Sequence, residues 1–124
     1  MNMTAAVECE GIVYKPGKPY RKPMEDKEQA RRREAAKMSL MMIGMSPNHV
    51  GYYYLAECIA LAAEAYHAGA WMVYVGKLME QVAIEHHKKP EAVERCITYA
   101  IDQSFAAKGM TAGRIINTIA DMIG

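Results

Sequence analysis

The sequence predicts an all-α fold, a compact bundle of about five helices that contains a helix-turn-helix and is preceded by a basic N-terminal arm. Two observations lead to this prediction. Apolar residues recur at spacings of three and four along most of the chain, and no stretch alternates with a period of two for long enough to form a sheet. The chain has 124 residues, 52% of them hydrophobic, so a single domain with one core is expected.

We expect residues 1–36 to form the basic arm and the start of a charged helix, and residues 37–124 to form the helical domain. Prolines and glycines interrupt any helix before Met24. The segment "KPGKPYRK" (15–22) carries four basic residues. It is interpreted either as an arm that follows DNA backbone or a minor groove, or as a free tail.

The first helix is predicted from Met24 to about Gly44, because this stretch is rich in strong helix formers and has acidic residues in its first turn. Its charged first half should be solvated and its apolar second half docked. The strip "MSLMMIGM", from Met38 to Met45, contains four methionines. Two interpretations stay open for it: packing in the core, or a partner-binding groove or dimer seam.

The second helix is predicted over residues 48–68, with Ser46 and Pro47 at its start and Gly69 at its end. Three consecutive tyrosines, 52–54, sweep about 200° around a helix, so they cannot all be buried. The apolar stripe of this helix consists of Leu55, Ile59, Ala62 and Tyr66.

Three more elements follow, and each is predicted from its apolar face. A helix from about Ala70 to Glu85 places on one face Trp71, Val75, Leu78, Met79 and Val82. After the turn "HHKKP", a helix over about 90–107 buries Val93, Cys96, Ile97, Ala100, Ile101 and either Ser104 or Phe105. The last helix starts at Thr111 and carries Ile115, Ile116, Ile119, Met122 and Ile123.

The turn between the third and fourth helices is the candidate functional site. At 100° per residue, the side chains on the half of helix 90–107 opposite its apolar face are Glu91, Arg95, Thr98, Tyr99 and Asp102. In a helix-turn-helix the second helix presents its N-terminal half to the major groove of DNA. Arg95 is placed to donate two hydrogen bonds to guanine, and such a pair contributes about 1–3 kcal/mol of discrimination.

Basic residues near this turn are candidates for phosphate contacts, namely Lys88 and Lys89 in the turn and Lys77 on the preceding helix. Glu91 and Glu94 oppose them electrostatically, although Glu94 can also accept from cytosine N4 or orient the neighbouring arginine. The alternative interpretation is an ordinary solvated helix face with weak pairs between charges three or four residues apart.

The charge distribution limits how DNA can be bound. Residues 1–37 hold nine basic and six acidic residues, a net charge of +3, whereas residues 38–124 hold six basic and eight acidic residues, a net charge of −2. This excludes the strong basic field of a general nucleic-acid binder, whose affinity comes from counterion release. Any contact of the helical domain with DNA must therefore be local.

Other functional classes are not indicated by the sequence. Three widely separated cysteines argue against a disulfide framework or zinc site, and Cys58 and Cys96 are expected to be small buried residues. Adjacent His86 and His87 point about 100° apart and cannot easily share a metal ion. We expect no enzyme activity, cofactor, small-molecule substrate or membrane contact, and a cytoplasmic location.

Two blocks of the sequence carry a resemblance to a known family. They are "IGMSPNHVGYYYLAECI" (43–59), which contains His49-Val50-Gly51-Tyr52, and "LMEQVAIEHHKKPEAVERCITYAID" (78–102). The chain resembles the C-terminal DNA-binding effector domain of the stage-zero sporulation protein A family. The resemblance implies an all-helical transcription-factor domain whose recognition helix enters the major groove, with Glu94 and Arg95 at the DNA interface.

The chain departs from that family in three respects. Thr98 and Tyr99 occupy positions that are usually basic, so the family's target sequence does not carry over. The residues before the domain are too few to fold a receiver, and only "AAKGMTAG" (106–113) spans the gap in which the family has an activating segment. Two hypotheses follow: a helix-turn-helix regulator of transcription that acts by occupying its sites, or a protein-interaction module, carried on a mobile element, that inhibits a host regulator or nuclease. A homodimer or a protein partner at Met38–Met45 is compatible with either.

Overall fold

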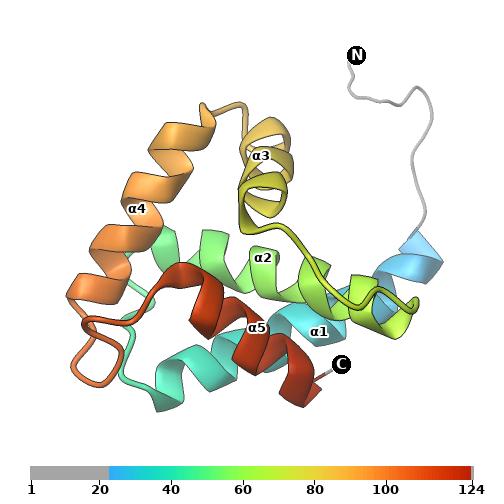
Figure 1. Cartoon of the computed structure of the whole chain (residues 1–124), viewed down its shortest axis with the longest axis horizontal. Helices are drawn as coiled ribbons and strands as arrows, with labels where there is room; N and C mark the ends of the chain where they lie inside the picture. The colour runs from blue at the N-terminus through green and yellow to red at the C-terminus, as the bar shows by residue number, and fades with distance from the viewer. Residues whose placement is uncertain (1–22, 124) are drawn as a thin grey trace. The chain divides into compact units, whose positions relative to one another are not determined.

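The computed structural model describes residues 23–123, and their side chains from Lys27 onward; the basic arm expected at the N-terminus lies outside these residues. The described residues form five helices and no strand, so the predicted all-α class is confirmed (Figure 1). Among the described residues, 23–30 belong to one unit and 31–123 to a second. The helices are α1 (Pro23–Met42), α2 (Val50–His67), α3 (Val75–Glu85), α4 (Pro90–Asp102) and α5 (Ala112–Ile123).

Helix α2 is the centre of the second unit. It contacts α3, α4 and α5, and in Figure 1 it runs between α3 and α4 on one side and α5 on the other. Ten of its 18 residues are buried, which is typical of a helix surrounded by others. The largest side chains that it shares in the core with its neighbours include Leu55, Ile59, Val82, Val93, Ile97, Ile115 and Ile116. This core holds α3 and α4 against one common support.

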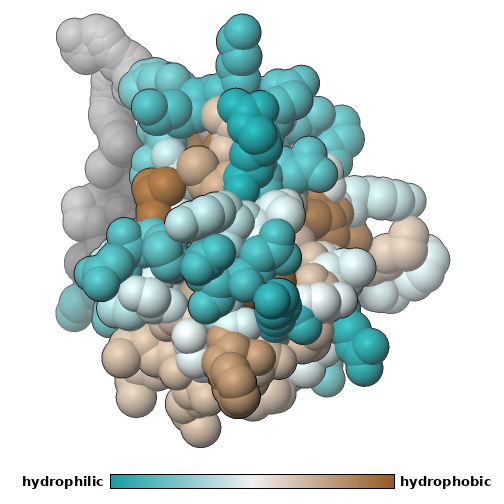
Figure 2. All heavy atoms as spheres, turned by 90° about the vertical axis from the view of Figure 1, so that its left-hand side faces the viewer, coloured by the Kyte–Doolittle hydropathy of each residue, from teal (hydrophilic) through white to brown (hydrophobic). Residues whose placement is uncertain are grey.

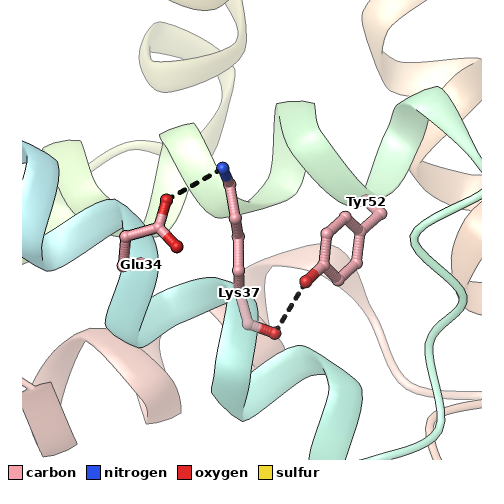
Figure 3. Close-up of polar contacts among 3 residues, drawn as sticks. All are labelled: Glu34, Lys37 and Tyr52. Carbon is pink, nitrogen blue, oxygen red and sulfur yellow. Dashed lines mark hydrogen bonds and ion pairs between the residues drawn. The ribbon is translucent and has the colours of Figure 1, made fainter.

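The part of α1 that belongs to the second unit is tied to α2 by a tyrosine. The Tyr52 hydroxyl donates to the backbone oxygen of Lys37 at 3.0 Å, and the Lys37 ammonium pairs with Glu34 at 3.1 Å (Figure 3). Burial raises the pKa of the Tyr52 hydroxyl above its usual value, so this donor keeps its proton. Tyr53 is exposed whereas Tyr52 and Tyr54 are buried, as three consecutive helical residues require.

The third helix begins later than predicted. Gly69 adopts a φ of +104° and closes α2 with a Schellman motif, in which the Ala70 N–H donates to Ala65 O at 2.9 Å. Tyr74 is extended and immediately precedes α3, so residues 70–74 are not helical. Trp71 is 87% exposed and does not share the buried face of α3, which corrects the predicted start at Ala70.

The fourth helix ends earlier than predicted, at Asp102 rather than 107. The reason is a side-chain contact: the buried Ser104 hydroxyl donates to Ile43 O at 2.9 Å and accepts from the Ala107 N–H at 3.3 Å. These bonds turn the chain toward the end of α1, leaving the Phe105 side chain almost fully exposed. Of the two residues predicted as alternatives for burial, Ser104 is therefore the buried one.

The methionine strip is only partly in the core. Met45 and Leu40 are buried, but Met38, Met41 and Met42 are 66%, 55% and 86% exposed. The expectation that the second half of the first helix is docked is therefore wrong for three of its methionines. Met122, predicted on the apolar face of the last helix, is also exposed.

Candidate nucleic-acid interface

The corner between α3 and α4 is built by a second Schellman motif. His86 ends α3, His87 adopts a left-handed φ of +57°, and the Lys88 N–H donates to Ala83 O at 2.8 Å. Lys89 is extended, and Pro90 occupies the first turn of α4, where a missing N–H costs nothing. The turn is therefore short and conformationally defined, as a helix-turn-helix requires.

Helix α4 separates an apolar face from a polar one. Val93, Ile97, Ala100 and Ile101 are buried on one side. Every residue that the sequence places on the opposite half is exposed, and so is the neighbouring Glu94; together they are Glu91, Glu94, Arg95, Thr98, Tyr99 and Asp102. Figure 2 views the molecule from the side on which α4 lies, and its surface there is mostly hydrophilic. The structure thus leaves room for a ligand against Arg95.

The three lysines expected to contact phosphates are also exposed. Lys88 and Lys89 lie in the turn itself. Lys77 lies in the first turn of α3 and forms a loose ion pair with Glu80 at 4.0 Å. Because both partners are more than half exposed, this pair is weak and does not prevent Lys77 from contacting another anion.

A shallow groove runs along α4, and its second wall is the start of α2. The residues that line it are Asn48, His49, Val50, Gly51, Glu94, Arg95, Cys96, Thr98, Tyr99 and Asp102. The His49 and Tyr99 rings meet edge to face with centroids 5.2 Å apart. His49 is the residue before α2 and makes no capping hydrogen bond with its side chain.

The contribution of residues 48–51 to this groove was not predicted from the sequence. Its origin is the close approach of two helix backbones at Gly51. A Cβ atom at this position would lie 2.0 Å from Cys96 O and 2.9 Å from Ile97 N, so only glycine fits. Glycine in the first turn of an otherwise apolar helix was the available signal, but the partner helix cannot be read from it.

The charges of this surface are nearly balanced. Across α3, the turn and α4, four exposed residues are basic, namely Lys77, Lys88, Lys89 and Arg95. Five are acidic, namely Glu80, Glu85, Glu91, Glu94 and Asp102. Attraction to phosphates must therefore come from individual lysines, because the surface as a whole has no positive field.

Cysteine and histidine side chains do not build a metal centre in the part of the chain that the structure describes, where no cluster of three potential ligands occurs. Cys58 is a buried free thiol, as predicted, whereas Cys96 is only partly buried because it lies in the groove. Burial, together with the nearby Glu57 and Glu85 carboxylates, raises the pKa of Cys58 to about 12. From residue 23 to 123, no helix is both long and apolar enough to cross a bilayer.

The fold and this corner define a helix-turn-helix domain whose second helix exposes an arginine-bearing face. Comparison with known families identifies it further: residues 37–122 match the family described as sporulation initiation factor Spo0A C terminal, and the chain belongs to this family. The family is a DNA-binding effector domain that regulates transcription rather than a family of enzymes, which supports a DNA-binding regulator with double-stranded DNA as its partner. No curated protein and no solved structure matches the chain.

Proposed function

We propose that this protein regulates transcription by occupying specific DNA sites, with α4 as the recognition helix. The observation that carries the proposal is the exposed face of α4, on which Arg95 is the only basic residue. Its guanidinium reads guanine, and Glu94 accepts from cytosine or orients the arginine. Glu91, Thr98 and Tyr99 lie beside it on the same face and adjust the preferred sequence.

The lysines of the turn and of the start of α3 position the domain on the duplex without reading sequence. Lys77, Lys88 and Lys89 each neutralise one phosphate in this proposal. Three phosphate contacts correspond to a slope of roughly −3 when the logarithm of the binding constant is plotted against the logarithm of salt concentration. That slope is modest, as expected for a surface on which acidic residues outnumber basic ones.

Occupancy rather than activation is supported by the connection between α4 and α5. It spans only residues 103–111, and its one buried polar side chain, Ser104, is used to hold the end of α1. The activating segment that the sequence resemblance implies for this place has no room in so short a connection. A domain that binds DNA without such a segment acts by excluding other proteins from its site.

The test compares three variants on one preferred duplex, selected from a random pool, and on random duplexes. Arg95→Ala should weaken binding to the preferred duplex by about 5- to 150-fold and remove most of the preference. Lys88→Ala should weaken binding to all duplexes alike and reduce the salt slope by about 1. Arg114→Ala removes the same charge from an exposed position on α5 and should change neither property. An unchanged preference in Arg95→Ala would remove the base-reading role.

A second candidate function is favoured by the exposure of Met38, Met41 and Met42 on α1. Exposed apolar side chains cluster at protein interfaces, and methionine adapts to different partners. Figure 2 shows apolar surface gathered at the lower edge of the view, where the end of α1 and the connection after α4 lie in Figure 1. Ser104 holds these two segments together through its bond to Ile43.

In this second function the strip Met38–Met45 forms a homodimer or binds a protein partner. The protein then acts by inhibiting that partner and not by binding DNA. Sedimentation of the unaltered chain and of a variant with glutamine at positions 38, 41 and 42 tests the homodimer. Self-association that the variant loses, together with no binding to any duplex at micromolar protein, would support the interaction module. A monomer that binds DNA as proposed above would exclude it.

A further inference from the structure

A side chain of the helix-turn-helix corner is anchored to the helix behind it. His86 Nε2 lies 2.9 Å from one carboxylate oxygen of Glu57 on α2 and 3.1 Å from the other. The His86 ring also meets the Tyr54 ring edge to face, with centroids 5.0 Å apart. The side chains of His86 and Glu57 are 36% and 23% exposed, so the contact is partly shielded from water.

His86 lies at the turn whose position determines where Lys88 and Lys89 point. It caps the end of α3, and the chain reverses at His87 immediately after it. Lys88 and Lys89, the phosphate contacts of the proposed interface, follow within three residues. A rotation of the corner about the end of α3 would move both ammonium groups relative to Arg95, which is held separately by the packing of α4 on α2.

We propose that Glu57 is a positioning residue for DNA binding: through His86 it holds the turn on α2, so that Lys88 and Lys89 meet phosphates in register with Arg95. The inference rests on the proposed function and adds a residue outside the helix-turn-helix to it. Glu57 itself has the wrong charge to contact phosphates. Its carboxylate accepts the imidazole N–H, and a bond with a charged partner is stronger than a neutral one.

The direction in which DNA affinity changes in a Glu57 variant distinguishes a positioning role from a direct effect of the carboxylate's charge. Removing an acidic residue from a DNA-binding domain should strengthen its attraction to phosphates. Glu57→Ala should nevertheless weaken binding to all duplexes by roughly fivefold, the factor that corresponds to the loss of one ordinary hydrogen bond. Glu64→Ala is the matched control, since it removes the same charge from an exposed position on the same helix, and it should leave binding unchanged or slightly stronger.

Two further variants show whether Glu57 acts through His86. Glu57→Gln retains an oxygen that can accept the imidazole N–H, so it should recover most of the lost affinity. In a His86→Ala background, Glu57→Ala should have no further effect on affinity, because residues that act through one contact are not additive. Full additivity of the two changes would overturn the proposal.

Hydrogen exchange gives a readout that does not depend on DNA. The Lys88 amide, which donates to Ala83 O, should exchange faster in Glu57→Ala, whereas amides of α5 should keep their rates. Equal acceleration throughout the domain would show a role in global stability only and overturn the positioning role. Unchanged affinity of the folded Glu57→Ala variant, with normal binding by the unaltered chain, would also overturn it and leave the proposed function intact. Failure of the unaltered chain to bind any duplex would overturn both.

Discussion

Alanine at position 51 would place a methyl group inside the backbone of α4. The Cβ atom would lie 2.0 Å from Cys96 O, 2.5 Å from Cys96 C and 2.9 Å from Ile97 N. All three distances are below 3.0 Å, a separation that real Cβ atoms essentially never undercut. Since the obstructing atoms are backbone, no change of rotamer can relieve the clash, and α2 and α4 must separate by about 1 Å at this crossing.

The expected loss of stability follows from that displacement. Overpacking a core typically costs about 1–3 kcal/mol, and a clash with backbone belongs at the upper end, so we expect about 3 kcal/mol for Gly51→Ala. Binding should also weaken, because the separation moves Arg95 relative to His49 across the groove. A misplacement on the order of 1 Å is large compared with the tolerance of a bidentate hydrogen bond.

A matched control removes the effect of helix propensity. Gly76 occupies the second position of α3, as Gly51 does in α2, and a Cβ atom added to Gly76 would meet open space, with no neighbouring atom within 4 Å. Gly76→Ala should therefore be neutral or stabilising by up to about 1 kcal/mol. Urea unfolding of both variants measures the difference. Equal stability of the two would refute the close approach of α2 and α4 from which the groove is built.

Two further predictions concern single residues of the same framework. His87→Gly should raise the free energy of unfolding by about 0.5–1 kcal/mol, because His87 adopts a left-handed φ of +57°, a conformation that costs glycine less. Gly69, in the equivalent position at the end of α2, also has a positive φ. Thermal or urea unfolding measures the change, and an equal or lower stability would contradict the prediction. The pKa of the Cys58 thiol rises from its ordinary value of 9.0 to about 12 when the chain folds. Above pH 9 the unfolded chain therefore loses a proton that the folded chain keeps, and the free energy of unfolding should fall as the pH rises to about 12. Cys58→Ala should lack this component, and parallel pH profiles of the two proteins would exclude it.

The elements that the sequence predicted well have strong local signals. The start of α4 at Pro90 and the burial of Ile115, Ile116 and Ile119 on α5 agree with the structure, because a proline in the first turn and a regular spacing of isoleucines depend only on neighbouring residues. Trp71 gave a false signal. Its spacing from Val75 fits a helix, but a spacing does not show that a residue is buried, and the Schellman motif at Gly69 ends α2 without starting a new helix.

The parts that could not be predicted depend on contacts between distant residues. Helix α4 ends where it does because the Ser104 hydroxyl bonds to the backbone of Ile43, 61 residues earlier in the chain. Nothing near Ser104 in the sequence indicates that partner. The same holds for His86 and Glu57, which are 29 residues apart. Periodicity identified the outward face of α4, but the groove exists only because Gly51 brings the start of α2 against it.

The balance of charge around the corner determines what kind of regulator the proposed function allows. A protein that bound DNA mainly through counterion release would be distributed over the large excess of non-specific sites in a genome. Here Glu91, Glu94 and Asp102 lie on the same face as Arg95 and repel phosphates wherever the arginine does not find its base. Repulsion of wrong sites raises specificity without strengthening the correct contact. Replacing Glu91 by glutamine should therefore tighten binding to random duplexes more than to the preferred duplex, and a larger gain on the preferred duplex would show that this acid does not serve discrimination.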